Sequence, residues 1–111
     1  MKHPKKVVVV AKKVSIKRIK IDESFKVENI VASANLNVEL DLFNIAMEVD
    51  NVEYEPEQFP GAIMRLKDIG TTLLLFKNGK VICSGAKSEK QIAKSIKAAV
   101  GLLRKFMKQR P

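Results

Sequence analysis

The sequence has few of the side chains on which enzymes and metal sites depend. Its 111 residues include one cysteine, Cys83, one histidine, His3, and no tryptophan. One cysteine cannot form a disulfide within the chain, and one histidine with one cysteine cannot supply a zinc site or a Cys/His catalytic pair. No phosphate-binding loop, nucleophile–base pair or carboxylate pair stands out either. We therefore predict a protein that is not an enzyme and that carries no metal and no cofactor.

Long hydrophobic runs are missing as well. The apolar run at residues 7–11 is far too short for the core of a signal peptide or for a membrane span. Cys83 lies in the run VICS at residues 81–84, which predicts a small buried core residue and suits a reducing compartment. These absences favour an intracellular protein that is not secreted and has no membrane partner.

Charge of one sign dominates the two ends of the chain. The net charge is +9, and residues 1–20 carry eight Lys or Arg and no acid. Residues 87–110 carry another eight against one acid, whereas residues 26–80 hold nine acids and five bases. Basic ends favour an anionic partner, of which nucleic acid is the usual one. A merely solvated, soluble surface explains the same composition, so charge alone leaves both interpretations open.

Alternation of apolar and polar residues predicts most of the strands. We expect one or two strands at residues 6–21, one at 28–36, an extended acidic stretch at 52–57, and strands at 63–67, 71–77 and 80–84. The dipeptide Asn78-Gly79 predicts a two-residue hairpin between the last two strands.

Two helices are predicted from their caps and apolar spacing. Asp41 can cap a short helix with Leu42 and Ile45 on its apolar side. Ser88 and Gln91 form a capping box at the start of a second, amphipathic helix of about twenty residues. Its apolar stripe consists of Ile92, Ile96, Val100, Leu103 and Met107.

The two helices can cover only one face of the predicted sheet. Under them we expect Ile30, Ala32, Leu73, Leu75, Val81 and Cys83. The opposite face would present Asn29, Val31, Ser33, Thr72, Leu74, Phe76, Ile82 and Ser84. Such a surface is too apolar to remain wet without a reason. A second copy or the N-terminal segment could cover it, or it could be a platform for the floor of a DNA minor groove. Periodicity supports both interpretations about equally.

Four segments carry a family resemblance: residues 28–33 (ENIVAS), 51–61 (NVEYEPEQFPG), 72–80 (TLLLFKNGK) and 84–89 (SGAKSE). In this order and spacing they resemble one of the two direct repeats of the TATA-binding protein family, archaeal type. The resemblance implies an α+β fold, a curved antiparallel β-sheet with two helices on the convex face, which is half of the family's saddle. It also divides the chain into a basic N-terminal β extension, residues 1–25, and a single repeat, residues 26–108.

The resemblance also implies a DNA-binding surface on the concave face of the sheet. Phe59 and Phe76 match the wedges that enter a base step of an A·T-rich element, and Asn29 matches a donor to minor-groove acceptors. Arg65 and Lys80 match phosphate contacts. The full set that we expect to bind DNA is Asn29, Val31, Ser33, Phe59, Arg65, Leu74, Phe76, Asn78, Lys80, Ile82, Ser84 and Lys87.

The family has two repeats in one chain, whereas this sequence has one. We therefore expect a homodimer that joins through the first strands of two repeats and binds double-stranded DNA in transcription initiation or its regulation. The resemblance places such a protein in the cytoplasm of an archaeon, on the nucleoid, with general transcription factors as partners at the acidic residues 53–58. Two alternatives remain open: an accessory module for duplexes or RNA–DNA hybrids, and a protein-interaction module that dimerises with or regulates a full-length relative.

Overall fold

The computed structural model describes residues 14–22 and 27–109, with side chains from residue 30 onward. The elements in chain order are β1 (Val14–Asp22), β2 (Val27–Asn35), β3 (Val38–Leu40), α1 (Leu42–Glu48), β4 (Val52–Tyr54), β5 (Ala62–Leu66), β6 (Thr71–Leu75), β7 (Lys80–Ala86), α2 (Glu89–Leu103), the 3₁₀ turn η1 (Arg104–Phe106) and β8 (Met107–Gln109).

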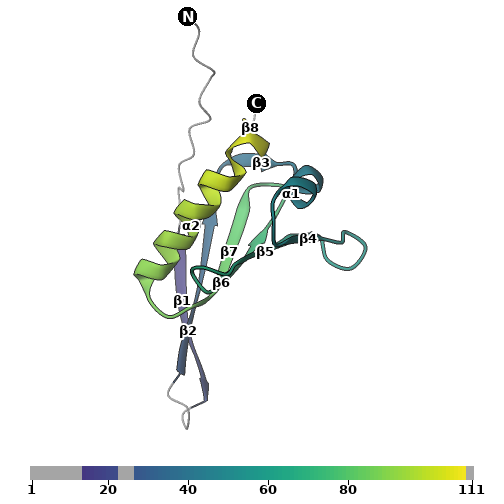
Figure 1. The fold of residues 1–111 in the computed structure, drawn as a ribbon. Coiled ribbons are helices and arrows are strands. Elements are labelled where there is room, and N and C mark those ends of the chain that lie inside the picture. The colour runs from purple at the N-terminus through teal and green to yellow at the C-terminus, as the bar shows by residue number, and fades with distance from the viewer. Residues whose placement is uncertain (1–13, 23–26, 110–111) are drawn as a thin grey trace, which may run out of the picture.

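Six strands form one antiparallel sheet in the order β1-β2-β7-β6-β5-β4, and β3 pairs with β8 in a separate two-stranded sheet. Both helices lie on one side of the curved six-stranded sheet (Figure 1). This is the α+β fold, with a strand in the N-terminal extension, that the sequence predicts.

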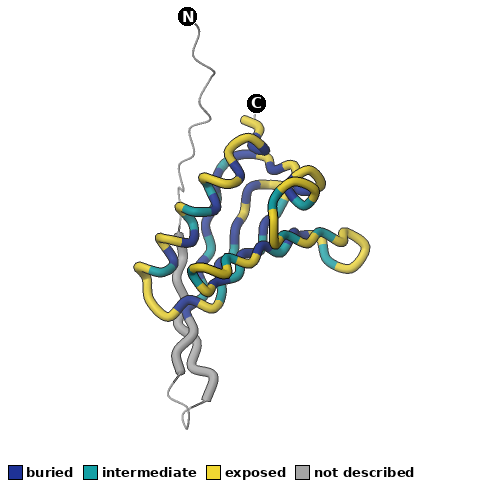
Figure 2. The backbone as a smooth tube through the Cα atoms, viewed as in Figure 1, coloured by how far each residue is buried: buried dark blue, intermediate teal, exposed yellow. Residues whose placement is uncertain are grey.

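The core lies between the sheet and the helices (Figure 2). Along β2 from Ile30 onward and along β5, β6 and β7, buried residues alternate with half-buried or exposed ones, because successive side chains of a strand point to opposite faces. All six residues expected beneath the helices are at most 1% exposed: Ile30, Ala32, Leu73, Leu75, Val81 and Cys83. Burial raises the pKa of the Cys83 thiol, and a hydrogen bond with Ser95 opposes this in part. Cys83 is therefore the inert core residue that its sequence context predicts.

Helix α1 begins where the sequence indicates. The Asp41 carboxylate accepts hydrogen bonds from the backbone N–H of Asn44 at 3.2 Å and from its side-chain Nδ2 at 2.6 Å. Leu42 and Ile45 are buried on the side that faces the sheet. The acidic stretch that follows is shorter than expected. Strand β4 ends at Tyr54, because the carbonyl of Glu55 accepts from the N–H groups of Gln58 and Phe59 and closes a turn.

Helix α2 has the expected start and an earlier end. Ser88 Oγ accepts from the N–H of Gln91 at 3.1 Å, and the Gln91 side chain accepts from the N–H of Lys87. The same amide donates to the carbonyl of Ile69 at 2.8 Å and so ties the β5–β6 turn to the helix.

The expected twenty-residue helix is wrong at its C-terminal end. Helix α2 stops at Leu103, and Met107 belongs to β8, where it pairs with Leu40 of β3. Tertiary strand pairing overrides the helical spacing here. Neither β3 nor β8 is predicted by the sequence, since each has only three residues and depends on the other.

The turn between β6 and β7 also differs from the expected two-residue hairpin. Phe76 donates to the carbonyl of Lys80, and Gly79 donates to the carbonyl of Phe76. The loop therefore has three residues, and Gly79 adopts a positive φ of 91°, as such loops require. A Cβ at Gly79 would lie 2.3 Å from the carbonyl oxygen of Val38, so the passage of β3 across this turn also requires glycine.

The N-terminal extension contributes one strand to the sheet. Residues 14–22 pair antiparallel with β2, from Val14 opposite Ala34 to Asp22 opposite Val27. The remainder of the two-strand prediction, residues 6–13, lies outside the described residues.

Candidate nucleic-acid interface

Among the described residues, no helix covers the face of the sheet opposite α1 and α2, the open face, and cross-strand pairing arranges its residues in rows. One row runs from Ser33 to Ile82, Leu74, Ile63 and Glu53. The next row runs from Ser84 to Thr72 and Arg65. The uncharged members of both rows are half-buried rather than fully exposed. The open face is thus a shallow surface whose central rows are apolar or small and polar.

A bulge in β7 adjusts the pairing with β2 at this face. Ile30 pairs with Ala86 and Ala32 with Cys83, so Ser84 and Gly85 together lie opposite Val31. Gly85 has a φ of 83°, which glycine adopts without strain. A bulge increases the local twist of a sheet, and this one includes two of the expected binding positions, Val31 and Ser84.

Phe59 and Phe76 meet at the end of the open face. Their ring centroids are 5.8 Å apart and their planes are inclined by 66°, an edge-to-face contact. Phe76 follows β6, whereas Phe59 comes from the turn between β4 and β5. Gly61 allows this approach, because a Cβ there would lie 2.9 Å from the Phe59 ring and 3.0 Å from the Phe76 ring. Two residues 17 positions apart in the sequence therefore form one aromatic pair, half-buried and accessible from the open face.

Arg65 lies on the open face but has a partner that the sequence does not predict. Its guanidinium donates a hydrogen bond to the carboxylate of Glu53 and forms an ion pair with it. Arg65 also donates its backbone N–H to the carbonyl of Asn51. The expected phosphate contact is thus already occupied by a carboxylate.

The remaining residues expected to bind DNA lie in different parts of the structure. Lys80 shares the open face with Ile82 and Ser84, since the three alternate with buried residues of β7. Asn78 lies in the β6–β7 turn, where its side chain accepts from the N–H of Lys80. Lys87 is exposed at the corner between β7 and α2. Asn29 pairs with Ile19 of β1, and its side chain lies outside the described part of the structure.

Sequence reasoning missed Ile63 and Glu53 as members of this surface. The alternation of strand 63–67 places Ile63 and Arg65 on one face, and this signal could have identified Ile63. Glu53 belongs to the stretch predicted to be extended and acidic, and its place beside Arg65 could not be predicted because it depends on the register of β4 with β5.

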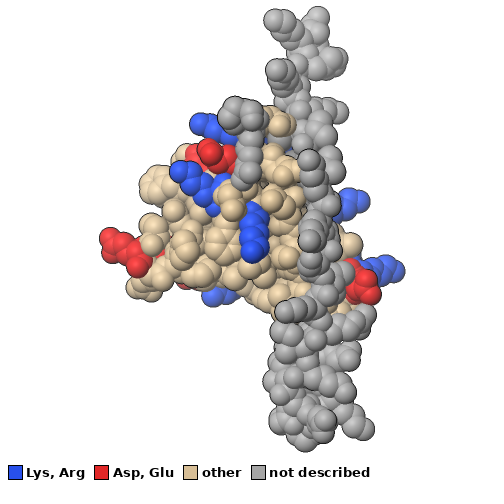
Figure 3. Space-filling view, turned by 180° about the vertical axis from the view of Figure 1, so that it is seen from behind, with Lys and Arg blue, Asp and Glu red and all other residues tan. Residues whose placement is uncertain are grey.

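The charges around the open face are few. From behind, most of the surface outside the grey residues is formed by uncharged side chains (Figure 3). Together, a curved antiparallel sheet, helices on one face and a largely uncharged opposite face with an aromatic pair define an α+β protein whose sheet exposes one face.

Comparison with known proteins gives the family. The sequence profile described as "Transcription factor TFIID (or TATA-binding protein, TBP)" matches residues 24–106. The chain is 49% identical over 82 residues to the TATA-box-binding protein of Thermoplasma volcanium, covering 74% of this chain and 45% of that protein. It is 55% identical over 73 residues to that of Methanosphaera stadtmanae, covering 64% of this chain and 40% of the relative. The chain belongs to the TATA-binding protein family.

The solved structure titled "Methanococcus jannaschii TBP" has a similar fold, with a TM-score of 0.67 and 42% identity over 69% of this chain and 44% of that one. The chain thus spans less than half the length of the relatives that it matches. The edge of β2, at which we expected a second repeat to join, is paired with β1 in this chain.

Proposed function

We propose that this protein binds the minor groove of A·T-rich double-stranded DNA on the open face of its sheet and acts in transcription initiation or its regulation. The observation that carries the proposal is the pair Phe59–Phe76 at the end of a shallow, largely uncharged sheet surface. The names of the relatives agree with it, since they are TATA-box-binding proteins.

The chemistry of the open face suits a minor groove better than a major groove. Minor-groove proteins insert apolar side chains between base pairs and bend the duplex, as described for the TATA-binding protein itself. Unstacking a base step costs a few kcal/mol, which contact with the widened groove offsets. Val31, Leu74 and Ile82 provide apolar contact, and Ser33, Ser84 and Asn29 provide groups for hydrogen bonds. Lys80, Asn78, Lys87 and Arg65 are assigned to the sugar–phosphate backbone.

We further propose that two copies act together on one site. The repeat, residues 26–108, supplies a single aromatic pair, and two copies related by a two-fold axis supply two. Because β1 already pairs along β2, the second copy joins at the outer edge of β1 rather than at β2. The mass of the protein–DNA complex tests this arrangement. As an intracellular DNA-binding protein, it would meet general transcription factors at the acidic turn of residues 53–58.

A fluorescence-anisotropy titration of three labelled duplexes at one salt concentration tests the DNA proposal. The duplexes are a TATA-like element, a version with G·C substitutions and an RNA–DNA hybrid. We expect the TATA-like duplex to bind most tightly. Equal binding of all three, or preference for the hybrid, would favour an accessory hybrid-binding module instead. Absence of binding to any duplex would favour a module that binds other proteins.

A further inference from the structure

The open face carries an ion pair between Glu53 and Arg65. Glu53 is the central residue of β4, the outermost strand of the sheet on this side, and it pairs with Ile63 of β5. Arg65 follows Ile63 by two residues, so both side chains project from the same face of β5. The carboxylate and the guanidinium therefore meet on the surface that we propose as the DNA site.

The structure fixes the positions of both residues while leaving their charged groups accessible. Strand pairing holds Glu53 opposite Ile63 and Arg65 opposite Thr72, and the N–H of Arg65 donates to the carbonyl of Asn51 at 2.9 Å. The side chain of Arg65 is 48% exposed and that of Glu53 is 56% exposed. An incoming anion can reach the guanidinium without any opening of the fold.

An exposed ion pair of this kind is weak. Because solvent screens it, such a pair stabilises a folded protein by at most about 1 kcal/mol. A DNA phosphate, which belongs to a dense line of negative charge, can therefore compete with Glu53 for the guanidinium. After that exchange the carboxylate remains beside the phosphate and repels it.

We propose that Glu53 is an internal competitor for Arg65: the carboxylate occupies the guanidinium in the free protein, and a phosphate of the nucleic acid displaces it on binding. This inference deepens the proposed DNA binding and rests on it. Glu53 therefore lowers the affinity for nucleic acid. It acts on the electrostatic part of that affinity, which does not depend on the base sequence. Arg65 contributes its full charge to binding only when Glu53 has been displaced or removed.

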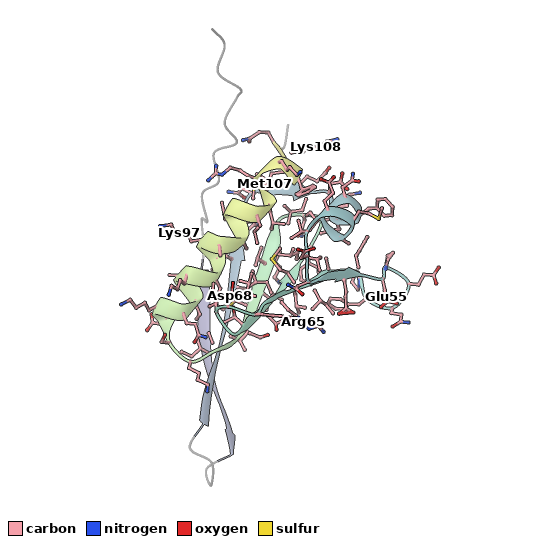
Figure 4. All side chains as sticks on the ribbon, viewed as in Figure 1. Glu55, Arg65, Asp68, Lys97, Met107 and Lys108 are labelled. Carbon is pink, nitrogen blue, oxygen red and sulfur yellow. The ribbon has the colours of Figure 1, made fainter. Side chains whose placement is uncertain are left out.

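Four variants test the exchange: Glu53→Gln, Arg65→Ala, the double variant and the matched control Glu55→Gln. Glu55 lies on the loop beyond β4, away from Arg65 of β5 (Figure 4). Glu55→Gln therefore removes the same charge two residues away and leaves the ion pair intact. Affinity for the TATA-like duplex is measured at several salt concentrations for each protein, and thermal melts verify that each variant is folded.

We expect Glu53→Gln to bind about threefold more tightly, the factor expected for one exposed charge pair. The plot of log affinity against log salt should also steepen, because in the wild type the displaced Glu53 carboxylate takes up cations that offset part of the counterion release from the phosphate. Arg65→Ala should flatten that slope, and Glu53→Gln should not steepen it in the Arg65→Ala background. The control should keep the wild-type slope. Equal effects of Glu53→Gln and Glu55→Gln would overturn the proposal, since only net charge would then matter.

Elution from heparin–agarose separates this inference from the DNA proposal, because heparin is a polyanion without a groove. If the wild-type protein binds no duplex, the proposed function fails. Elution from heparin then still tests whether an anion competes with Glu53 for Arg65. Elution of Glu53→Gln at higher salt than Glu55→Gln supports competition for Arg65. Elution of both at the same salt overturns it.

Discussion

The Phe76 ring differs from an ordinary core side chain in its position. It is half-buried, makes an edge-to-face contact with Phe59 and follows a strand whose alternate residues face the open surface. If it enters a base step, Phe76→Ala removes base–aromatic contact, which contributes on the order of 1–3 kcal/mol per base. We expect this variant to lose roughly tenfold or more in affinity for the A·T-rich duplex and much less for a random duplex, as measured by anisotropy.

The matched control for Phe76→Ala is Phe43→Ala. Phe43 lies on α1 and is 64% exposed, so its removal deletes the same side chain from the helical side of the molecule. This variant should retain wild-type affinity for both duplexes. Equal losses of the two duplexes in Phe76→Ala would contradict insertion into a base step, because contacts that read no sequence weaken all duplexes alike.

The glycines permit a second prediction for single residues. Gly79 has a positive φ and no room for a Cβ beside the Val38 carbonyl, whereas Gly101 in α2 has nothing within 4 Å of the corresponding point. Gly79→Ala should lower the free energy of unfolding by about 2 kcal/mol or more. Gly101→Ala should raise it by about 0.5–1 kcal/mol, because alanine favours a helix. Urea unfolding measures both, and a loss in Gly101→Ala equal to that in Gly79→Ala would refute the steric argument.

At the scale of the elements, the cap of α1 predicts a dependence of stability on pH. Hydrogen bonds from the side chain and then the backbone of Asn44 hold the pKa of the Asp41 carboxyl below its usual value. Because the folded pKa is lower than the unfolded one, this contribution to stability is complete above the unfolded value, about 3.9. It is lost as the pH falls through the folded value.

Asp41→Asn isolates this contribution, because asparagine caps helices as well as aspartate but does not titrate. We expect its urea midpoint to fall less than that of the wild type between pH 5 and about 3. Glu57→Gln removes a carboxylate that caps no helix. Its urea midpoint should fall with pH as much as that of the wild type. If the urea midpoint falls equally at acid pH in all three proteins, the Asp41 carboxylate does not contribute to the dependence of stability on pH.

The elements also show how far the sequence determines this fold. Local signals located the starts of both helices, since Asp41 and Ser88 cap them through neighbours three residues away. Alternation located the buried face of the sheet. Strands β3 and β8 were missed, because Leu40 and Met107 become strand residues only by pairing with each other across the chain.

The residues of the candidate site also fall into two groups, those that the sequence indicates and those that only the tertiary structure brings together. Alternation and family resemblance indicated Leu74, Ile82 and Ser84, whose faces follow from period two. The ion pair of Glu53 with Arg65 was missed because it depends on the register of two strands joined by a turn. Contacts of this kind require the three-dimensional structure.

At the scale of the whole molecule, strand β1 determines how a second copy can join. It pairs along β2 and ends the six-stranded sheet on that side. Its sequence VSIKRIKID carries Lys17, Arg18 and Lys20, and charged residues on an edge strand oppose pairing with another chain. Residues 1–20 hold eight basic residues and no acid. This charge disfavours pairing of two free copies, and a DNA duplex bound on the open faces of both copies supplies the opposite charge.

We therefore expect the homodimer to assemble on DNA, with two chains on one duplex that carries a palindromic TATA-like element. Sedimentation velocity measures the masses of the protein alone and of the complex at saturating protein. The complex should contain two chains, and a duplex with a single half-site should bind only one. One chain on the full duplex at saturation would contradict the dimer, because a single repeat would then bind by itself. Two chains on the half-site duplex would instead indicate binding by charge alone, which loses affinity steeply with added salt.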